Sequence, residues 1–215
     1  MTVTTRWWWI RHAPVVNHSG RIYGHTDVDC DTGNTRLSRA LAQMLPARPV
    51  LVVTPLRRTA RTLEAILAER TAKPVDSPEP LPEFLIEPDL REQHFGAWTG
   101  MTHAEVARQR GAEAHRFWIS PAHERPEGGE SFADVVDRVG HAVARLSAKH
   151  AGRDIVVVAH GGSIRAALAI ALGVDPETAL RFSVFNQSLT RIDHIAPGDG
   201  SPAVWRIESV NMVPY

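Results

Sequence analysis

The chain has 215 residues, 43% of them hydrophobic and 22% charged, a balance typical of folded globular proteins that excludes disordered and collagen-like classes. Lysine plus arginine and aspartate plus glutamate each number 24, so the formal net charge is zero and does not provide the broad basic field that nucleic-acid binding uses. No stretch approaches the ~20 apolar residues of a membrane span or resembles a signal peptide. We therefore expect a cytoplasmic protein with one domain over residues 1–215, without a membrane or nucleic-acid partner.

Arginine dominates the cationic side chains, because Lys73 and Lys149 are the only lysines. A guanidinium group grips phosphate and carboxylate through paired N–H groups, although the coding bias of a GC-rich genome explains most of the excess. The single cysteine, Cys30, has no partner for an internal disulfide, and no Cys/His spacing is typical of a zinc site. The composition indicates an anionic ligand and no metal or cofactor.

Three short apolar runs predict the central strands, and they cover residues 6–11, 49–54 and 154–159. Runs of this length without polar alternation suit strands buried on both faces, as in a parallel sheet. Apolar residues at helical spacing predict helices at residues 56–70, 132–146 and 163–172. Ser131 is expected to cap the second of these, and Thr102 with Glu105 forms the capping box of a shorter helix.

The remaining segments are predicted as loops and edge strands. Residues 73–88 and 119–129 are rich in Pro, Glu and Gly, which is typical of loops. Residues 183–193 and 203–211 look like two further strands joined by a turn. The repetition of strand and helix predicts an α/β fold with three α/β/α layers and a mostly parallel central sheet.

Candidate chemistry lies at the ends of the three predicted strands, where ligands collect in an open parallel sheet. Arg11 and His12 end the first strand, Arg58 follows the second, and His160 with Gly161 follows the third. A neutral imidazole is a nucleophile near pH 7, and guanidinium groups hold phosphoryl oxygens. Backbone N–H groups at a glycine-rich helix start bind the same anion. This arrangement predicts phosphoryl transfer through histidine.

The same residues fall into motifs of a known family. Residues 11–14, Arg-His-Ala-Pro, resemble the Arg-His-Gly signature of the histidine phosphatase superfamily, the phosphoglycerate-mutase-like proteins. Residues 54–59 resemble its Ser-Pro-Leu-x-Arg segment, residues 90–96 its Leu-x-Glu-x-x-Phe-Gly segment, and residues 158–165 its second histidine motif. Together with residues 185–188 these blocks follow the family's order and spacing over nearly the whole chain.

The resemblance implies a phosphoglycerate-mutase-like fold and a metal-independent, two-step mechanism on a small phosphate ester. His12 would attack phosphorus, and Glu92 would protonate the leaving oxygen and then deprotonate the water that cleaves the phosphohistidine. The phosphoryl oxygens would be held by four groups: Arg11, Arg58, His160 and the Gly161 amide. The alternative role for Glu92 is a salt bridge to its neighbour Arg91.

The segment after the nucleophile departs from the family pattern. Ala13 and Pro14 replace the usual Gly-Glu or Gly-Gln, which should reshape the substrate contacts. Asn17 lies one residue nearer the nucleophile than the Asn of the mutases, so it is carried over as a phosphate or substrate contact. Residues 20–28 resemble a segment of α-ribazole phosphatases, which places Tyr23, Gly24 and His25 at the border of the substrate pocket; a turn fixed by two glycines would explain the same residues.

Hydrolysis is favoured over mutase activity, because Gly162 follows the second His-Gly pair and the Leu-x-Glu block carries no mutase-like insertion. Three alternatives stay open: α-ribazole phosphatase activity specifically, mutase-type phosphoryl transfer, and a phosphate-binding interaction domain without turnover. A thiol phosphatase is disfavoured even though residues 30–36 satisfy Cys-x-x-Gly-x-x-Arg, because the acidic neighbours of Cys30 would raise its pKa. The physiological substrate and the oligomeric state are not predicted.

Overall fold

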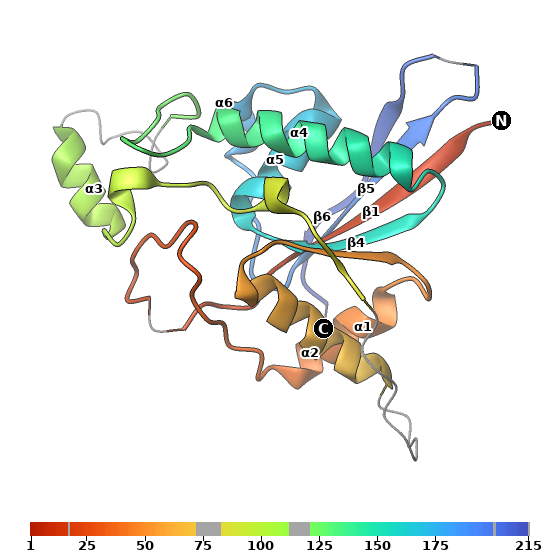
Figure 1. Cartoon of the computed structure of the whole chain (residues 1–215), viewed down its shortest axis with the longest axis horizontal. Coiled ribbons are helices and arrows are strands. Elements are labelled where there is room, and N and C mark those ends of the chain that lie inside the picture. Colours follow the sequence, from red (N-terminus) through yellow and green to blue (C-terminus); the bar gives the residue numbers. More distant parts are fainter. Residues whose placement is uncertain (17, 72–82, 112–120, 200, 215) are drawn as a thin grey trace.

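A computed structural model describes residues 1–16, 18–71, 83–111, 121–199 and 201–214. A six-stranded sheet in the order β3-β2-β4-β1-β5-β6 forms the middle layer, with helices on both faces (Figure 1). The strands are β1 (Val3–Arg11), β2 (Val50–Val53), β3 (Leu85–Ile86), β4 (Asp154–Ala159), β5 (Leu189–Ala196) and β6 (Val204–Met212). The first four run parallel, and β5 and β6 add an antiparallel edge. The predicted three-layer fold is confirmed.

The three buried apolar runs form β1, β2 and β4 as predicted, and the two edges of the sheet depart from prediction. The predicted loop over residues 73–88 contains β3, which pairs with Val52 and Val53; residues 73–82 lie outside the described residues. The strand predicted from residue 183 begins only at Leu189, because Gln187 has a positive φ of 55° and turns the chain. Residues 183–188 therefore form a loop beside the end of β1.

The helices are α1 (Thr35–Met44), α2 (Arg57–Thr71), α3 (His103–Arg110), α4 (Phe132–Lys149), α5 (Gly161–Leu172) and α6 (Pro176–Ala179), with 3-10 turns at Pro88–Leu90 and Gly96–Trp98. The predicted caps at Thr102 and Ser131 are both present as capping boxes. Helix α1 was not predicted; its N-cap is Asn34, whose side chain accepts a hydrogen bond from the Leu37 amide.

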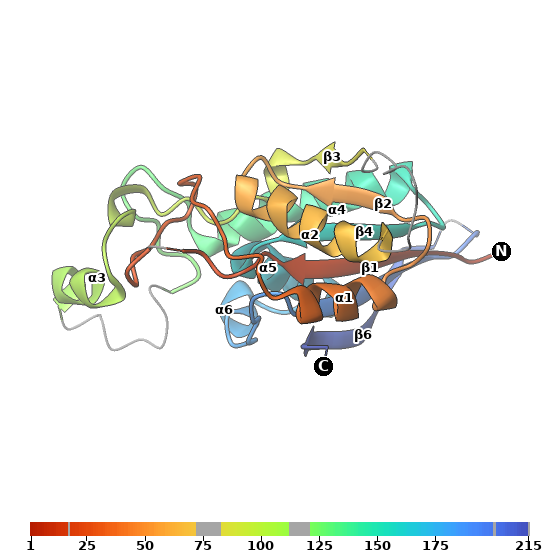
Figure 2. The ribbon, with the colours of Figure 1, turned by 90° about the horizontal axis from the view of Figure 1, so that it is seen from below.

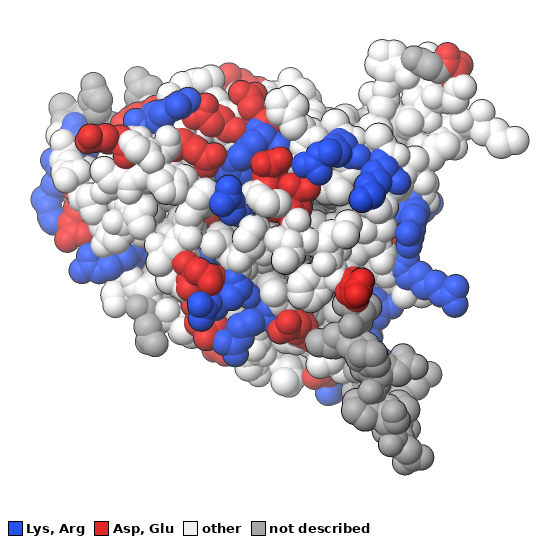
Figure 3. All heavy atoms as spheres, viewed as in Figure 1, with Lys and Arg blue, Asp and Glu red and all other residues white. Residues whose placement is uncertain are grey.

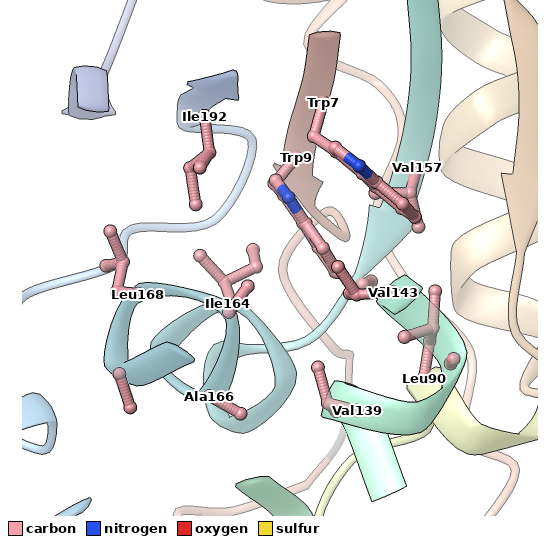
Figure 4. Packing of buried hydrophobic residues seen from close by; sticks show 14 of the residues in the cluster. Trp7, Trp9, Leu90, Val139, Val143, Val157, Ile164, Ala166, Leu168 and Ile192 are labelled. Carbon is pink, nitrogen blue, oxygen red and sulfur yellow. The ribbon is translucent and has the colours of Figure 1, made fainter. Parts of the chain in front are cut away.

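Alternate residues of the central strands point to opposite faces of the sheet and build two apolar clusters. Trp7 and Trp9 of β1 pack with Val157 against α4 and α5, and their rings stack with centroids 5.2 Å apart (Figure 4). Ile10 and Val156 face the other way, toward α1 and α2. The two clusters hold β1 and β4 rigidly in the middle of the sheet, so the ends of these strands are well-fixed points.

The carboxyl ends of β1, β2 and β4 lie at one end of the sheet. Two views show α3 and the loop after β1 extending from this end, with the N-terminus at the opposite end (Figures 1 and 2). The loop is joined to the α3 region by backbone hydrogen bonds between Ile22 and residues 100–101, and Ile22 packs with Trp98 and Val106. No helix of the described residues is long and apolar enough to cross a membrane.

Candidate active site

His12 follows β1 directly, and its side chain is fully buried. Its Nδ1 lies 2.7 Å from the carbonyl oxygen of Ala13, and because a carbonyl only accepts hydrogen bonds, Nδ1 carries the proton. Nε2 is then the unprotonated nitrogen, and it has no hydrogen-bond partner among the described residues. Burial and the charges of Arg58 and Arg11 hold the pKa of His12 well below its usual range. His12 is therefore a neutral imidazole with a bare Nε2 at physiological pH.

Arg58 and Arg11 both act electrostatically on His12, and both are held by backbone carbonyl groups. Arg58 in the first turn of α2 is fully buried and donates to the carbonyls of Gly24 (2.8 Å) and Thr26 (2.9 Å). Arg11 donates to the carbonyl of Val184 at 2.6 Å. The Nε–H of each is buried without a partner, and neither makes an ion pair within the described part of the chain. Two guanidinium groups tied to neutral carbonyls are available for an anion.

Arg58 and its neighbour Arg57 have different roles although the motif places them side by side. Arg57 is exposed and pairs with Asp27, with Nε and Oδ2 2.9 Å apart. Burial lowers the pKa of Arg58, an effect that the charge of Glu92 opposes, and a guanidinium stays protonated at neutral pH in either case.

His160 caps α5 and is also fully buried. Its Nε2 lies 3.0 Å from Oγ1 of Thr54, whereas Nδ1 has no partner among the described residues. The imidazole rings of His12 and His160 are 5.2 Å apart between centroids. Burial, then the charge of Arg58, holds the pKa of His160 well below its usual range. Thr54 was not recognised from the sequence, although it is the first residue of the motif that contains Arg58.

The glycines after His160 keep the start of α5 open. A Cβ on Gly161 would lie 3.2 Å from Nη1 of Arg165 and 3.8 Å from Cζ of Arg11, so the Gly161 backbone lies next to both guanidinium groups. Arg165 lines the cavity and donates its Nε–H to the carbonyl of Phe182 at 2.8 Å. A helix N-terminus beside two cations attracts an anion.

Glu92 lies against this helix start. Its Oε1 accepts hydrogen bonds from the amides of Gln93 and Gly162, both at 3.0 Å. The structure does not contain the alternative salt bridge between Glu92 and Arg91: the Arg91 Nε donates to the carbonyl of Pro88 instead. The Glu92 carboxylate is thereby fixed in the cavity wall beside Gly161 and Gly162.

A cavity of about 420 Å³ opens over the ends of the strands. Its lining includes Tyr23 and Gly24, where they were predicted. His25 is not among the lining residues: Nε2 of His25 lies 2.6 Å from the carbonyl oxygen of Glu92. Asn17 lies outside the described residues. The lining residues are Arg11, His18, Gly20, Arg21, Ile22, Tyr23, Gly24, Glu92, Gln93, Phe95, His103, Phe132, Gly161, Gly162, Arg165 and Leu180.

Cys30 is buried below Arg58, and its Sγ lies 3.5 Å from the Arg58 carbonyl. Burial raises the pKa of the thiol, and the charge of Asp29 acts in the same direction, so the effect predicted from the acidic neighbours is secondary to burial. Arg36 of the Cys-x-x-Gly-x-x-Arg pattern lies exposed on α1. The thiol-phosphatase alternative therefore has no anion site. Among the described residues, no group of three or more His, Cys, Asp or Glu side chains could hold a metal ion.

A bare histidine nitrogen, a second histidine, two arginines held by backbone carbonyls and a carboxylate at the strand ends of a parallel sheet define a phosphoryl-transfer enzyme. The chain belongs to the histidine phosphatase superfamily (branch 1), whose family model matches residues 7–208, and it is a phosphatase. The resemblance found from the sequence motifs is confirmed.

Relatives and solved structures of the family match most of the chain. A glucosyl-3-phosphoglycerate phosphatase of Mycolicibacterium vanbaalenii is 32% identical over 94% of this chain and 92% of its own. A metal-independent phosphoserine phosphatase of Arabidopsis thaliana is 32% identical over 73% of this chain and 64% of its own. The solved structure of a mycobacterial glucosyl-3-phosphoglycerate phosphatase, 27% identical, matches with a TM-score of 0.79 over 97% of this chain and 99% of that one. The α-ribazole phosphatase of Shigella flexneri shares the fold, with 23% identity, a TM-score of 0.74 and 98% of each chain covered.

Proposed function

We propose that this phosphatase hydrolyses a small phosphomonoester, without a metal, through a phosphohistidine on His12. The observation that carries the proposal is the state of His12. Nδ1 binds the Ala13 carbonyl, so the lone pair of Nε2 is free, and the ring lies beside His160 and within the electrostatic influence of Arg58. An imidazole held in this way is ready to attack phosphorus without first losing a proton.

In the first step Nε2 of His12 forms a bond to phosphorus while the ester P–O bond breaks. The leaving oxygen takes a proton from the Glu92 carboxyl group. Since Oε1 of Glu92 already accepts two amide hydrogen bonds, Oε2 is the oxygen that carries this proton. In the second step water attacks the phosphohistidine, the N–P bond breaks, and the Glu92 carboxylate takes the proton from water, which restores both groups.

Charge on the phosphoryl group is met by fixed donors: Arg11, Arg58, the Nδ1 side of His160 and the Gly161 amide. Each preorganised donor of this kind contributes about 10²–10³-fold to the rate. The two guanidinium charges match a phosphate dianion, so the chain's own residues supply the stabilisation that a metal provides in other phosphatases.

The substrate is a small-molecule phosphate ester in a cytoplasmic compartment, and we propose no nucleic-acid or membrane partner. Two relatives are named for esters that carry a carboxylate near the phosphate, glucosyl-3-phosphoglycerate and phosphoserine. These are the first compounds to assay, with α-ribazole phosphate and phosphoglycerates in the same phosphate-release screen. Isomerisation of a phosphoglycerate would favour the mutase alternative, and phosphate binding without release would favour the interaction domain.

The mechanism is tested by comparing the wild type with His12→Ala on an aryl phosphate in the presence of a chelator. The wild type should turn over and, after an alkaline quench, carry phosphate on His12. His12→Ala should lose at least about 10³-fold in kcat, as expected for the removal of a covalent nucleophile. Activity that survives in His12→Ala, or activity of the wild type that disappears with the chelator, would contradict the proposal.

A further inference from the structure

The backbone of the segment that carries Glu92 is bound by Arg138 of α4. Nη1 of Arg138 donates to the carbonyl oxygens of Asp89 (2.7 Å) and Arg91 (2.9 Å), and Nη2 donates to the carbonyl oxygen of Glu92 (2.9 Å). The three acceptors lie 46 to 49 residues before Arg138 in the chain. A single guanidinium group thus fixes the backbone on both sides of residue 91.

The other N–H groups of Arg138 bind Glu130, just before the N-cap of α4. Nε lies 2.8 Å from Oε1, and Nη2 lies 3.0 Å from Oε2. Oε2 of Glu130 also accepts a hydrogen bond from the His94 amide at 2.9 Å, and the Glu130 carbonyl accepts one from the Gln93 side chain. All five N–H donors of the Arg138 fork are therefore used, and the side chain is only 16% exposed.

We infer that Arg138 is the positioning residue of the proton donor Glu92, a role that rests on the function proposed above. Arg138 contacts the Glu92 backbone and does not line the cavity. Its charge also helps to lower the pKa of His160, an effect that is the same for every leaving group. A general acid works at hydrogen-bond distance from the leaving oxygen, and a displacement of about 1 Å costs about 10²-fold in rate. The charge of Arg138 is paired with the Glu130 carboxylate.

Arg145 is a matched control on the same helix, two turns further along. It pairs with Glu87 (2.9 Å) and Asp89 (3.3 Å), so it holds the same segment through side chains, before the segment reaches Glu92. Its side chain is 54% exposed. The face of the molecule that carries α4 shows acidic and basic side chains interleaved (Figure 3), as expected for such a set of surface pairs.

The test measures kcat/KM for a series of phosphate esters, from an activated aryl ester to a simple alkyl ester, with the variants Arg138→Met, Arg145→Met and Glu92→Gln. This parameter reports the steps up to departure of the leaving group, and an alkoxide leaving group depends on the acid far more than a stable phenolate. Arg138→Met should lose about 10²-fold on the alkyl ester and much less on the aryl ester. Arg145→Met should lower both values equally or not at all.

Equal losses of Arg138→Met on both esters, or the same alkyl-selective loss in Arg145→Met, would overturn the inference. Glu92→Gln distinguishes the acid role of Glu92 from the positioning role of Arg138. If Glu92→Gln shows no selective loss on the alkyl ester, the proposed acid role fails. If Glu92→Gln shows this selective loss and Arg138→Met does not, only the positioning role is rejected. If Arg138→Met does not fold, Arg138→Lys carries the same expectation, because one ammonium group cannot reach three carbonyls and a carboxylate.

Discussion

Replacing Gly162 with alanine tests the placement of Glu92 with the smallest change the chain allows. A Cβ at residue 162 would overlap Oε1 of Glu92, the oxygen that accepts hydrogen bonds from the Gly162 and Gln93 amides. Because this oxygen is the end of a flexible side chain, the carboxylate swings away and the backbone of α5 stays in place. The substitution thus acts on the proton donor and spares the phosphate site.

The cost to folding comes from two hydrogen bonds. Each hydrogen bond to a charged group contributes about 1.5–3 kcal/mol, so the loss of both costs about 3–6 kcal/mol, and alanine returns about 0.8–1 kcal/mol through its higher helix propensity. The displaced carboxylate faces the cavity, where water solvates it. We expect the free energy of unfolding to fall by no more than about 5 kcal/mol, which lowers Tm by at most roughly 10–20 °C for a chain of this size.

The cost to catalysis depends on the leaving group. Removing the acid from the leaving oxygen should lower kcat/KM for an alkyl phosphate about 10²-fold, while an activated aryl phosphate, which needs little protonation, is nearly unaffected. Gly140→Ala in α4 is the control: its Cβ would meet Ile170 at 3.6 Å, an ordinary contact, so its Tm and activity should stay near those of the wild type. A folded Gly162→Ala protein with the wild-type ratio of alkyl to aryl activity would refute the reasoning.

Two further predictions concern the buried histidines and the cysteine. The pKa of His12 and of His160 lies well below the usual value of 6.5, so the unfolded chain binds more protons below pH 6.5 and stability falls as the pH falls, by at most about 1.4 kcal/mol per pH unit for each histidine. Denaturant unfolding between pH 5 and 8 measures this slope, and His160→Gln should reduce it; an unchanged slope would show that other groups cause it. Cys30→Ser should keep kcat, because the thiol contacts the Arg58 carbonyl and the Thr62 hydroxyl, which a serine hydroxyl can also bind, and a loss of turnover in the folded variant would revive the thiol mechanism.

The sequence predicted the part of the site that follows buried strands. Arg11 ends an apolar run without polar alternation, and His12 and His160 directly follow such runs. A strand buried on both faces must lie in the middle layer, and ligands bind at the carboxyl ends of the strands in a parallel sheet. Local motifs then sufficed to place these residues together, and Arg58 at the start of α2 joined them for the same reason.

The supporting residues could not be predicted because their partners are backbone atoms far away in the chain. Arg138 binds carbonyl groups, which every residue has, so no residue type at positions 89–92 marks the contact. His25 was placed in the pocket from a loop resemblance, yet it also binds a carbonyl, that of Glu92. Strand β3 is only two residues long, too short for a periodic pattern, and its pairing depends on the neighbouring β2.

The carbonyl tethers of Arg11 and Arg58 have a thermodynamic consequence for the whole protein. Arg58 is fully buried and oriented by neutral carbonyl oxygens, and the charge of Glu92 offsets only part of the effect of its burial, so the empty enzyme carries an electrostatic penalty that an incoming anion relieves. The substrate, the transition state and the phosphate product all relieve this penalty. Relief by the product slows turnover, because it strengthens product binding. The fold is therefore least stable when it is empty, and the affinity of the site for its own product limits how fast the enzyme can be emptied.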